Sequence, residues 1–192
     1  MWWGMVLMSL NDAEKAQLLK LAHDSIEHGL QTGRPLSVSP EHFPATLAAN
    51  RASFVTLERL GQLRGCIGML EAIRPLVVDV AENAFSAAFR DPRFPPLTRS
   101  EWLGLDMHIS ILSPAEVMHF QSEQDLLKQL KPGIDGLILQ DGYHRGTFLP
   151  SVWEQIPAAE PFLTHLKQKA GLPADYWSDT LKISRYTTET FS

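Results

Sequence analysis

The chain has 192 residues, with 17 lysine and arginine residues against 22 aspartate and glutamate residues and a formal net charge of −5 at pH 7. This mild acidity, without a run of basic residues, argues against a nucleic-acid-binding protein. A single cysteine excludes an internal disulfide and any zinc site built on several thiolates, so we expect a cytoplasmic protein with no metal.

The N-terminal segment is apolar, but it is too short to span a bilayer. We therefore expect residues 1–10 to be an extension and residues 11–192 to form a single domain. Asn11 and Glu14 have the spacing of a capping box, and apolar residues then recur at helical spacing. Gly29 predicts the end of this first helix.

The next segments predict a β-hairpin. Ala52 to Glu58 alternates and is rich in β-forming residues, Gly61 and Gln62 form a turn, and Leu63 to Leu70 returns. The returning strand contains the only cysteine, Cys66, so the hairpin is the first candidate for a functional site.

The motif Leu63-Arg64-Gly65-Cys66-Ile67-Gly68 combines a thiol, a cation and two glycines. Strict alternation places Arg64, Cys66 and Gly68 on one side of the strand, where a guanidinium could stabilise a reactive thiolate. Glycine within a strand often marks a bulge or the close approach of a ligand or another backbone. The alternative is that Cys66 is a small buried hydrophobic residue.

A broad apolar stripe predicts a buried helix from Pro75 to Phe89. The loop after it is rich in proline and contains Asp91 and Arg93. Two interpretations stay open: an internal ion pair between Asp91 and Arg93 that holds the turn, or a corner that binds an anion.

The second half of the chain alternates short strands and helices. Leu105 to Leu112 predicts a strand with Asp106, His108 and Ser110 on its polar face. Further predicted elements are a helix at Asp125 to Leu130, a hairpin of Gly136 to Leu139 with His144 to Leu149, helices from Pro150 to Gln155 and from Pro161 to Ala170, and a last strand at Leu181 to Tyr186. These elements predict an α+β protein with a mixed, largely antiparallel sheet and flanking helices.

In this order of motifs the chain resembles the AMMECR-type domain family, whose bacterial and archaeal members are called AmmeMemoRadiSam system protein A. The resemblance rests on Ala52 to Leu57, Leu63 to Gly68, Asp91-Pro92-Arg93-Phe94 with Pro96-Leu97, Ile109-Ser110 with Leu112 and Pro114, Gly133 with Asp135-Gly136, Thr147 to Pro150 with Val152-Trp153, and Lys169 to Leu172 with Trp177. These motifs extend from the first helix almost to the C-terminus.

The resemblance implies a larger and a smaller subdomain with a cleft between them. It also implies association with a Memo-type protein and with a radical S-adenosylmethionine enzyme, but it supplies no settled reaction. The family motifs make these positions candidates for lining the cleft: Arg64, Gly65, Cys66, Gly68, Asp91, Arg93, Ser110, Asp135 and Thr147.

Two functional hypotheses follow. In the first, the protein acts on a small molecule or modified peptide, with Cys66 as nucleophile or covalent carrier, Arg64 as thiolate stabiliser and Arg93 as substrate anchor. His108 and His144 are both candidate bases, and the spacing selects neither.

In the second hypothesis, the protein is a non-catalytic scaffold that binds those enzymes through exposed aromatic residues. We expect no bound cofactor in either case. The sequence leaves the oligomeric state open, a homodimer included.

Overall fold

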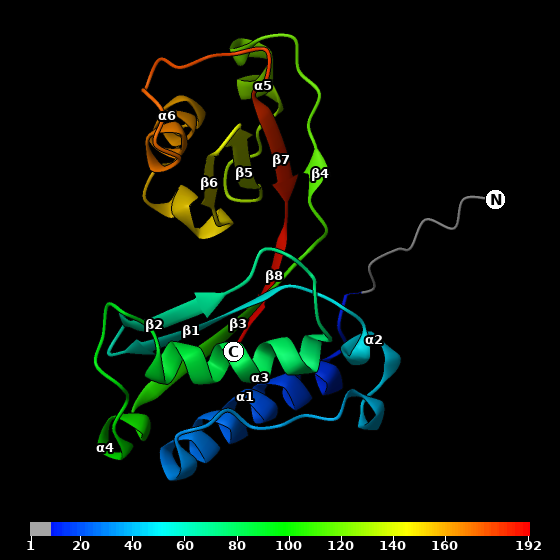
Figure 1. The fold of residues 1–192 in the computed structure, drawn as a ribbon, viewed down its shortest axis with the longest axis vertical. Helices are drawn as coiled ribbons and strands as arrows, with labels where there is room; N and C mark the ends of the chain where they lie inside the picture. Colours follow the sequence, from blue (N-terminus) through cyan, green and yellow to red (C-terminus); the bar gives the residue numbers. More distant parts are fainter. Residues whose placement is uncertain (1–8) are drawn as a thin grey trace, which may run out of the picture. The chain divides into compact units, whose positions relative to one another are not determined.

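The computed structural model describes residues 9–192, so most of the predicted extension, with Trp2 and Trp3, lies outside the described residues. The chain divides into two compact units. The first runs to Leu112 and also contains Glu189–Ser192, and the second comprises Ser113–Thr188. Each unit combines helices with a four-stranded sheet, which confirms the α+β class (Figure 1).

The first helix, α1 (Asp12–Thr32), begins with the predicted capping box, because Asn11 and Glu14 exchange hydrogen bonds. The prediction that Gly29 ends the helix is wrong, since α1 continues to Thr32 and is capped by Gly33 with a φ of 71°. Gly29 is buried within the helix. A Cβ atom there would overlap the ring of Phe85, so this glycine allows close helix packing instead.

The sheet of the first unit has the strand order β2-β1-β3-β8. Its strands are β1 (Ser53–Arg59), β2 (Gln62–Gly68), β3 (Leu105–Leu112) and β8 (Thr188–Phe191). The hairpin of β1 and β2 and the strand β3 match the predicted elements, and β1 pairs antiparallel with both neighbours. The last strand, β8, follows β7 after one residue and was not predicted from the sequence.

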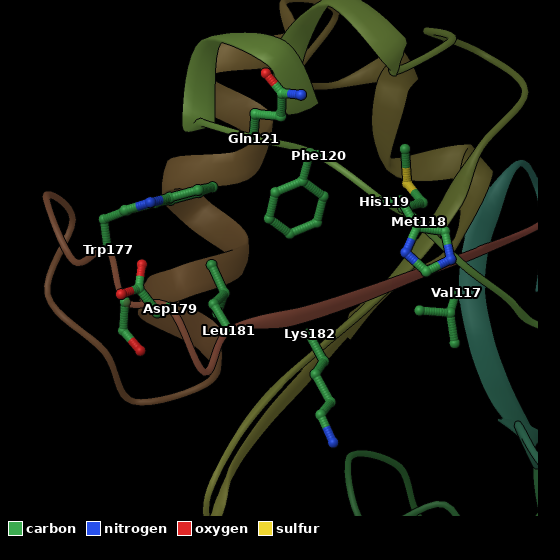
Figure 2. Close-up of a pocket in the computed structure, with 10 residues that line it drawn as sticks. Val117, Met118, His119, Phe120, Gln121, Trp177, Asp179, Leu181 and Lys182 are labelled. Atoms are coloured by element: carbon green, nitrogen blue, oxygen red, sulfur yellow. The ribbon is translucent and has the colours of Figure 1, made fainter.

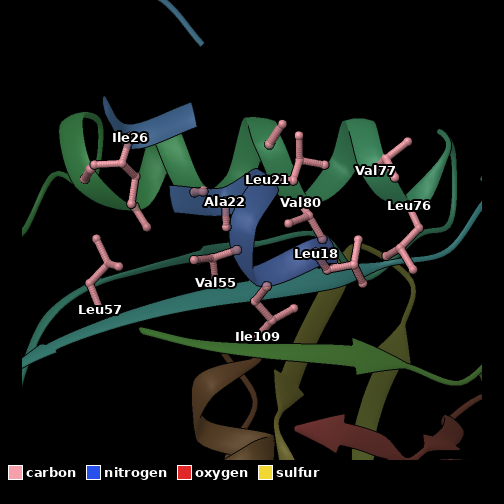
Figure 3. Packing of buried hydrophobic residues seen from close by; sticks show 14 of the residues in the cluster. Leu18, Leu21, Ala22, Ile26, Val55, Leu57, Leu76, Val77, Val80 and Ile109 are labelled. Atoms are coloured by element: carbon pink, nitrogen blue, oxygen red, sulfur yellow. The ribbon is translucent and has the colours of Figure 1, made fainter. Parts of the chain in front are cut away.

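One face of this sheet is covered by α1 and α3 (Leu76–Phe89), as Figure 3 shows. Val55, Leu57 and Ile109 point from the strands into this core and are fully buried. The first unit also contains the short elements η1 (Pro40–His42), α2 (Ala45–Ala48) and α4 (Arg99–Trp102). Because apolar side chains alternate along β1 and β3, the other face of the sheet carries the polar residues.

The second unit has the strand order β4-β7-β5-β6. Its elements are β4 (Glu116–Val117), α5 (Glu123–Gln129), β5 (Gly136–Asp141), β6 (His144–Phe148), η2 (Pro150–Glu154), α6 (Ala159–Lys169) and β7 (Lys182–Tyr186). A separate core forms around Phe162, whose ring stacks on Trp153 with the centroids 3.6 Å apart. The second unit therefore has a hydrophobic core of its own.

None of the helices within residues 9–192 is both long and apolar enough to cross a membrane.

Candidate functional site

The candidate site lies on the sheet face of the first unit that carries the polar residues. In the register of the sheet, Thr56 of β1 lies opposite Cys66 of β2 on one side and opposite His108 of β3 on the other. Directly opposite residues point to the same face of a sheet. The three side chains therefore form one row, and all three are half-buried.

Cys66 is held by three hydrogen bonds. The hydroxyl of Thr56 donates to its Sγ over 3.3 Å. The backbone N–H of Cys66 donates to Oδ2 of Asp91 over 2.9 Å, and its carbonyl oxygen accepts from Nη2 of Arg93 over 3.1 Å. The position of the thiol is thus fixed from both its side chain and its backbone.

Asp91 and Arg93 form the ion pair that was one of the two interpretations of their loop. Nη2 of Arg93 lies 2.6 Å from Oδ2 of Asp91, and Nε donates to Oδ1 over 2.9 Å. These bonds from Arg93, followed by the N–H of Cys66, hold the pKa of the Asp91 carboxyl far below its usual value. The hydrogen bonds with Asp91 raise the pKa of Arg93.

This ion pair blocks the outer edge of β2. As the last strand of the sheet, β2 leaves backbone groups that another strand could pair with. At Cys66 both of these groups are occupied, the N–H by Asp91 and the carbonyl by Arg93. Because Asp91 is only 4% exposed, its role is to fix the backbone of β2. Arg93 is half-exposed and is therefore the residue of the pair that can contact a ligand.

Strict alternation along β2 is wrong at Arg64. The register shifts between Leu57 and Glu58, which face Gly65 and Leu63, so Arg64 is an extra residue in a β-bulge. Its guanidinium donates to both carboxylate oxygens of Glu101, over 3.0 and 3.2 Å. It contacts Glu101 and not the thiol of Cys66.

The environment of Arg64 is that of a structural residue. It is 8% exposed, it also donates to the carbonyl oxygen of Pro95, and its Nη1 is buried without a partner. Arg64 and the N–H of Thr98 together lower the pKa of Glu101 to about 2. The bidentate pair thus ties β2 to α4 and to the proline-rich loop.

The two glycines of the motif allow close packing of the strand. A Cβ at Gly65 would overlap the carbonyl oxygen of Ala87 in α3. A Cβ at Gly68 would overlap the ring of Phe54. At both positions the neighbour is part of this chain, which is one of the possibilities that a glycine within a strand indicates.

The predicted residues on β3 are on the same face but not in contact with the thiol. His108 is two strands away from Cys66, which corresponds to about 10 Å, and its Nε2 lies 3.5 Å from Oε2 of Glu58. The hydroxyls of Ser110 and Thr190 are hydrogen-bonded over 2.8 Å. A direct proton transfer from Cys66 to His108 would require one of them to move.

Three further predicted site residues belong to the second unit. The carboxylate of Asp135 is buried and accepts from the N–H of Lys131. Nδ1 of His144 lies 3.0 Å from the carbonyl oxygen of Ala170. The hydroxyl of Thr147 is buried without a partner. The predicted cleft that would join these residues to the Cys66 motif stays a prediction.

Sequence reasoning missed two functional neighbours. Thr56 alternates with the buried Val55 and Leu57, and this pattern was sufficient to place it on the polar face. Glu101 was not among the predicted site residues, and no sequence pattern connects it to Arg64. Across residues 9–192, no three histidine, cysteine or acidic side chains form a group that could hold a metal ion.

Comparison with known proteins gives consistent matches along the chain. The family model described as AMMECR1 matches residues 19–191. A protein of Methanothermobacter thermautotrophicus is 37% identical over 188 residues, which are 95% of each chain. A protein of Methanocaldococcus jannaschii is 40% identical over 79% of this chain and 77% of its own.

Similarity extends to solved structures. The crystal structure of an uncharacterized protein from Pyrococcus horikoshii matches with a TM-score of 0.84 and 35% sequence identity. The match covers 94% of this chain and 92% of that protein.

Proposed function

This chain belongs to the AMMECR1 family, and we propose that it is a cytoplasmic component of a three-part system with a Memo-type protein and a radical S-adenosylmethionine enzyme. Within that system it acts on a small molecule or modified peptide at the Cys66 motif. The observation that carries this proposal is the half-buried thiol of Cys66, which is held by Thr56, Asp91 and Arg93.

In this proposal Cys66 is the nucleophile or covalent carrier. The sulfur adds to an unsaturated electrophilic carbon of the substrate, such as a carbonyl carbon, the π electrons of that bond move to the oxygen, and the thiol proton reaches this oxygen through solvent. Two neighbours are placed to act on the sulfur: the hydroxyl of Thr56 donates to Sγ, and the guanidinium of Arg93 donates to the carbonyl oxygen of Cys66. Arg93 replaces Arg64 as the candidate thiolate stabiliser, because Arg93 donates to the backbone of Cys66 whereas Arg64 contacts Glu101.

The reactivity of the single thiol tests this role directly. We expect iodoacetamide to label Cys66 in the native protein at least as fast as in the urea-unfolded chain, although folding restricts access. Protection of the native thiol until the chain unfolds would contradict the proposal. In the reconstituted three-part system, Cys66→Ser should abolish turnover, and an unchanged rate would exclude the nucleophile.

A second candidate function is a scaffold that binds the two enzymes without taking part in the chemistry. It is favoured by Leu60 at the tip of the hairpin of β1 and β2, which is 91% exposed and has a φ of 53°. Leucine is disfavoured in this left-handed conformation, and such strain is often retained at functional sites. If this candidate is correct, Leu60→Asn should weaken co-purification with the partners while Cys66→Ser leaves it unchanged.

A further inference from the structure

The face of the first sheet that carries Cys66 also carries an aromatic ring. Phe54 of β1 alternates with the buried Val55, so its side chain lies on the face away from α1 and α3, where it is half-buried. In the register of the hairpin, Phe54 lies directly opposite Gly68, and Thr56 lies directly opposite Cys66. Phe54 and Cys66 are therefore diagonal neighbours on one face of the sheet.

The ring of Phe54 occupies the space that a side chain at Gly68 would need. A Cβ atom at Gly68 would overlap Cγ and Cδ1 of this ring. Diagonal neighbours on a sheet are about 7–8 Å apart, a separation that an aromatic side chain can reach across. The ring therefore borders the position of a molecule that reacts with the thiol of Cys66, and Gly68 contributes by leaving room for it.

The residues on the other side of the thiol are charged. Glu58 and Asp106 lie directly opposite each other in β1 and β3, on the same face as Cys66, and Nε2 of His108 lies 3.5 Å from Oε2 of Glu58. An apolar group placed beside these carboxylates would have to displace their water, which costs free energy. An apolar group of a bound molecule is therefore better accommodated on the side of Phe54.

The hollow of the second unit that Figure 2 shows differs from this face. Its two rings, Phe120 and Trp177, contact each other with their centroids 5.6 Å apart, so no group fits between them. The hollow beside the rings is also lined by the charged residues Asp179 and Lys182. This mixed lining selects no class of ligand, whereas the ring of Phe54 lies beside a group that can react.

We propose that Phe54 is a specificity-determining residue, which binds an apolar group of the substrate next to the electrophilic carbon that Cys66 attacks. This inference rests on the proposed role of Cys66 as nucleophile and adds the class of substrate. Contact with the ring removes apolar surface from water, and a second ring in offset or tilted contact gains further attraction. The alternative is a structural role, in which Phe54 only covers the backbone at Gly68, as aromatic residues do beside glycines of edge strands.

Two maleimides with the same reacting group test this specificity on the full chain. In N-benzylmaleimide and N-methylmaleimide the sulfur bonds to one olefinic carbon, the π electrons move to the neighbouring carbon, and the thiol proton reaches that carbon through solvent. Cys66 is the single thiol, so the rate constant of labelling reports on this site alone. Each rate constant is divided by that of the urea-unfolded chain, which removes the intrinsic difference between the reagents. We expect the normalised rate constant of the benzyl reagent to be about fivefold larger.

Variants of the ring separate specificity from folding. Phe54→Leu keeps an apolar side chain but removes the ring, so the two normalised rate constants should agree within about twofold. Phe54→Met gives the same test if Phe54→Leu does not fold. The matched control is Phe191→Leu, which should keep the fivefold preference. Phe191 lies in β8 and packs against the core on the opposite face, where Nζ of Lys15 is 5.9 Å from its ring centroid.

The outcomes that overturn the role of Phe54 differ from those that overturn the proposed function. A native thiol that reacts with neither maleimide would exclude Cys66 as nucleophile, and the specificity would fall with it. Equal normalised rate constants in the wild type would leave the nucleophile in place and reduce Phe54 to its structural role. A benzyl preference that persists in a folded Phe54→Leu variant would also overturn the proposal, because another surface would then bind the benzyl group.

Discussion

The thiol of Cys66 depends on neighbours that are close in space and distant in sequence. Thr56 reaches it from the adjacent strand, and Asp91 and Arg93 reach its backbone from the loop after α3. The family motif around Cys66 contains none of these three residues. What the motif supplies is the strand geometry, and the chemistry of the thiol comes from the residues packed against it.

Thr56 provides a direct test of how the thiol is tuned. Thr56→Val keeps the shape of the side chain and removes the donor to Sγ. A hydrogen bond of about 1 kcal/mol that favours the thiolate corresponds to about a fivefold rate, so native alkylation of Cys66 should slow by that factor.

Ser110→Ala is the matched control for this change. It removes a hydroxyl from the same face that is bonded to Thr190, and it should leave the alkylation rate unaltered. Equal rates for Thr56→Val and the wild type would show that this hydrogen bond does not act on the sulfur.

Asp91 should matter more for stability than its place in a loop indicates. Asp91→Asn retains one acceptor oxygen but loses the charge that holds Arg93 and the N–H of Cys66. Because this carboxylate is buried, we expect the free energy of unfolding in urea to fall by about 1–3 kcal/mol. The exposed Asp106 is the control, since Asp106→Asn should stay within about 0.5 kcal/mol of the wild type.

The sequence predicted the wrong position for the side chain of Arg64. A period of two places Arg64 beside Cys66, and it would be correct for a regular strand. One extra residue in the bulge opposite Leu57 breaks that period and brings the guanidinium to Glu101. The glycines of the motif indicate that a bulge or a close approach is possible, but pairing with the partner strand decides whether a bulge forms and at which residue.

At the scale of elements, the contact of β2 with α3 decides how the cysteine strand sits in the first unit. Gly65 lies against the backbone of Ala87, and there is no room for a side chain between them. Gly65→Ala should therefore cost about 1–3 kcal/mol of unfolding free energy through overpacking.

Gly104 is a suitable reference for that substitution. A Cβ at Gly104 meets no atom within 4 Å, so Gly104→Ala should change the unfolding free energy by no more than about 0.5 kcal/mol. Similar losses for Gly65→Ala and Gly104→Ala would mean that backbone entropy, and not the approach of α3, explains the effect.

Local signals predicted most elements well and failed where tertiary contacts take over. The capping box at Asn11 and the alternation of Leu105 to Leu112 are local, and both predictions are confirmed. Gly29 has the usual signature of a helix end, but packing against α3 keeps it inside α1. The strand β8 has only one strongly apolar residue, Phe191, and it exists through pairing with a distant part of the chain.

At the scale of the whole molecule, the chain is not divided at a single point. The first unit is completed by Glu189–Ser192, after the second unit has ended. Glu189 contacts the start of the chain, because it accepts from the hydroxyl of Ser9 and pairs with Lys15 over 3.0 Å. Such a return depends on contacts between the two ends of the sequence, which composition and periodicity cannot indicate.

The stability of the fold should depend on pH at both the acid and the alkaline extreme. In the first unit, Glu101 has a pKa lowered from 4.5 to about 2 by Arg64, so the folded state binds fewer protons than the unfolded chain between these values. The stabilisation by Glu101 is complete above pH 4.5 and is lost as the pH falls toward 2. Asp91, whose pKa is also lowered, acts in the same direction.

In the second unit, burial raises the pKa of the Tyr186 phenol well above its ordinary value of 10.0. Its contribution to stability is complete below pH 10 and decreases as the pH rises further, because the unfolded chain then ionises more readily. The free energy of unfolding in urea, measured from pH 2 to 11, should therefore be constant at intermediate pH and should decrease toward both acid and alkaline pH. Glu101→Gln should reduce only the decrease in unfolding free energy at acid pH, and Tyr186→Phe only the decrease at alkaline pH. Tyr143 is exposed, so Tyr143→Phe should leave both decreases unchanged. A decrease at alkaline pH that persists in Tyr186→Phe would assign it to another group and contradict the role of this buried phenol.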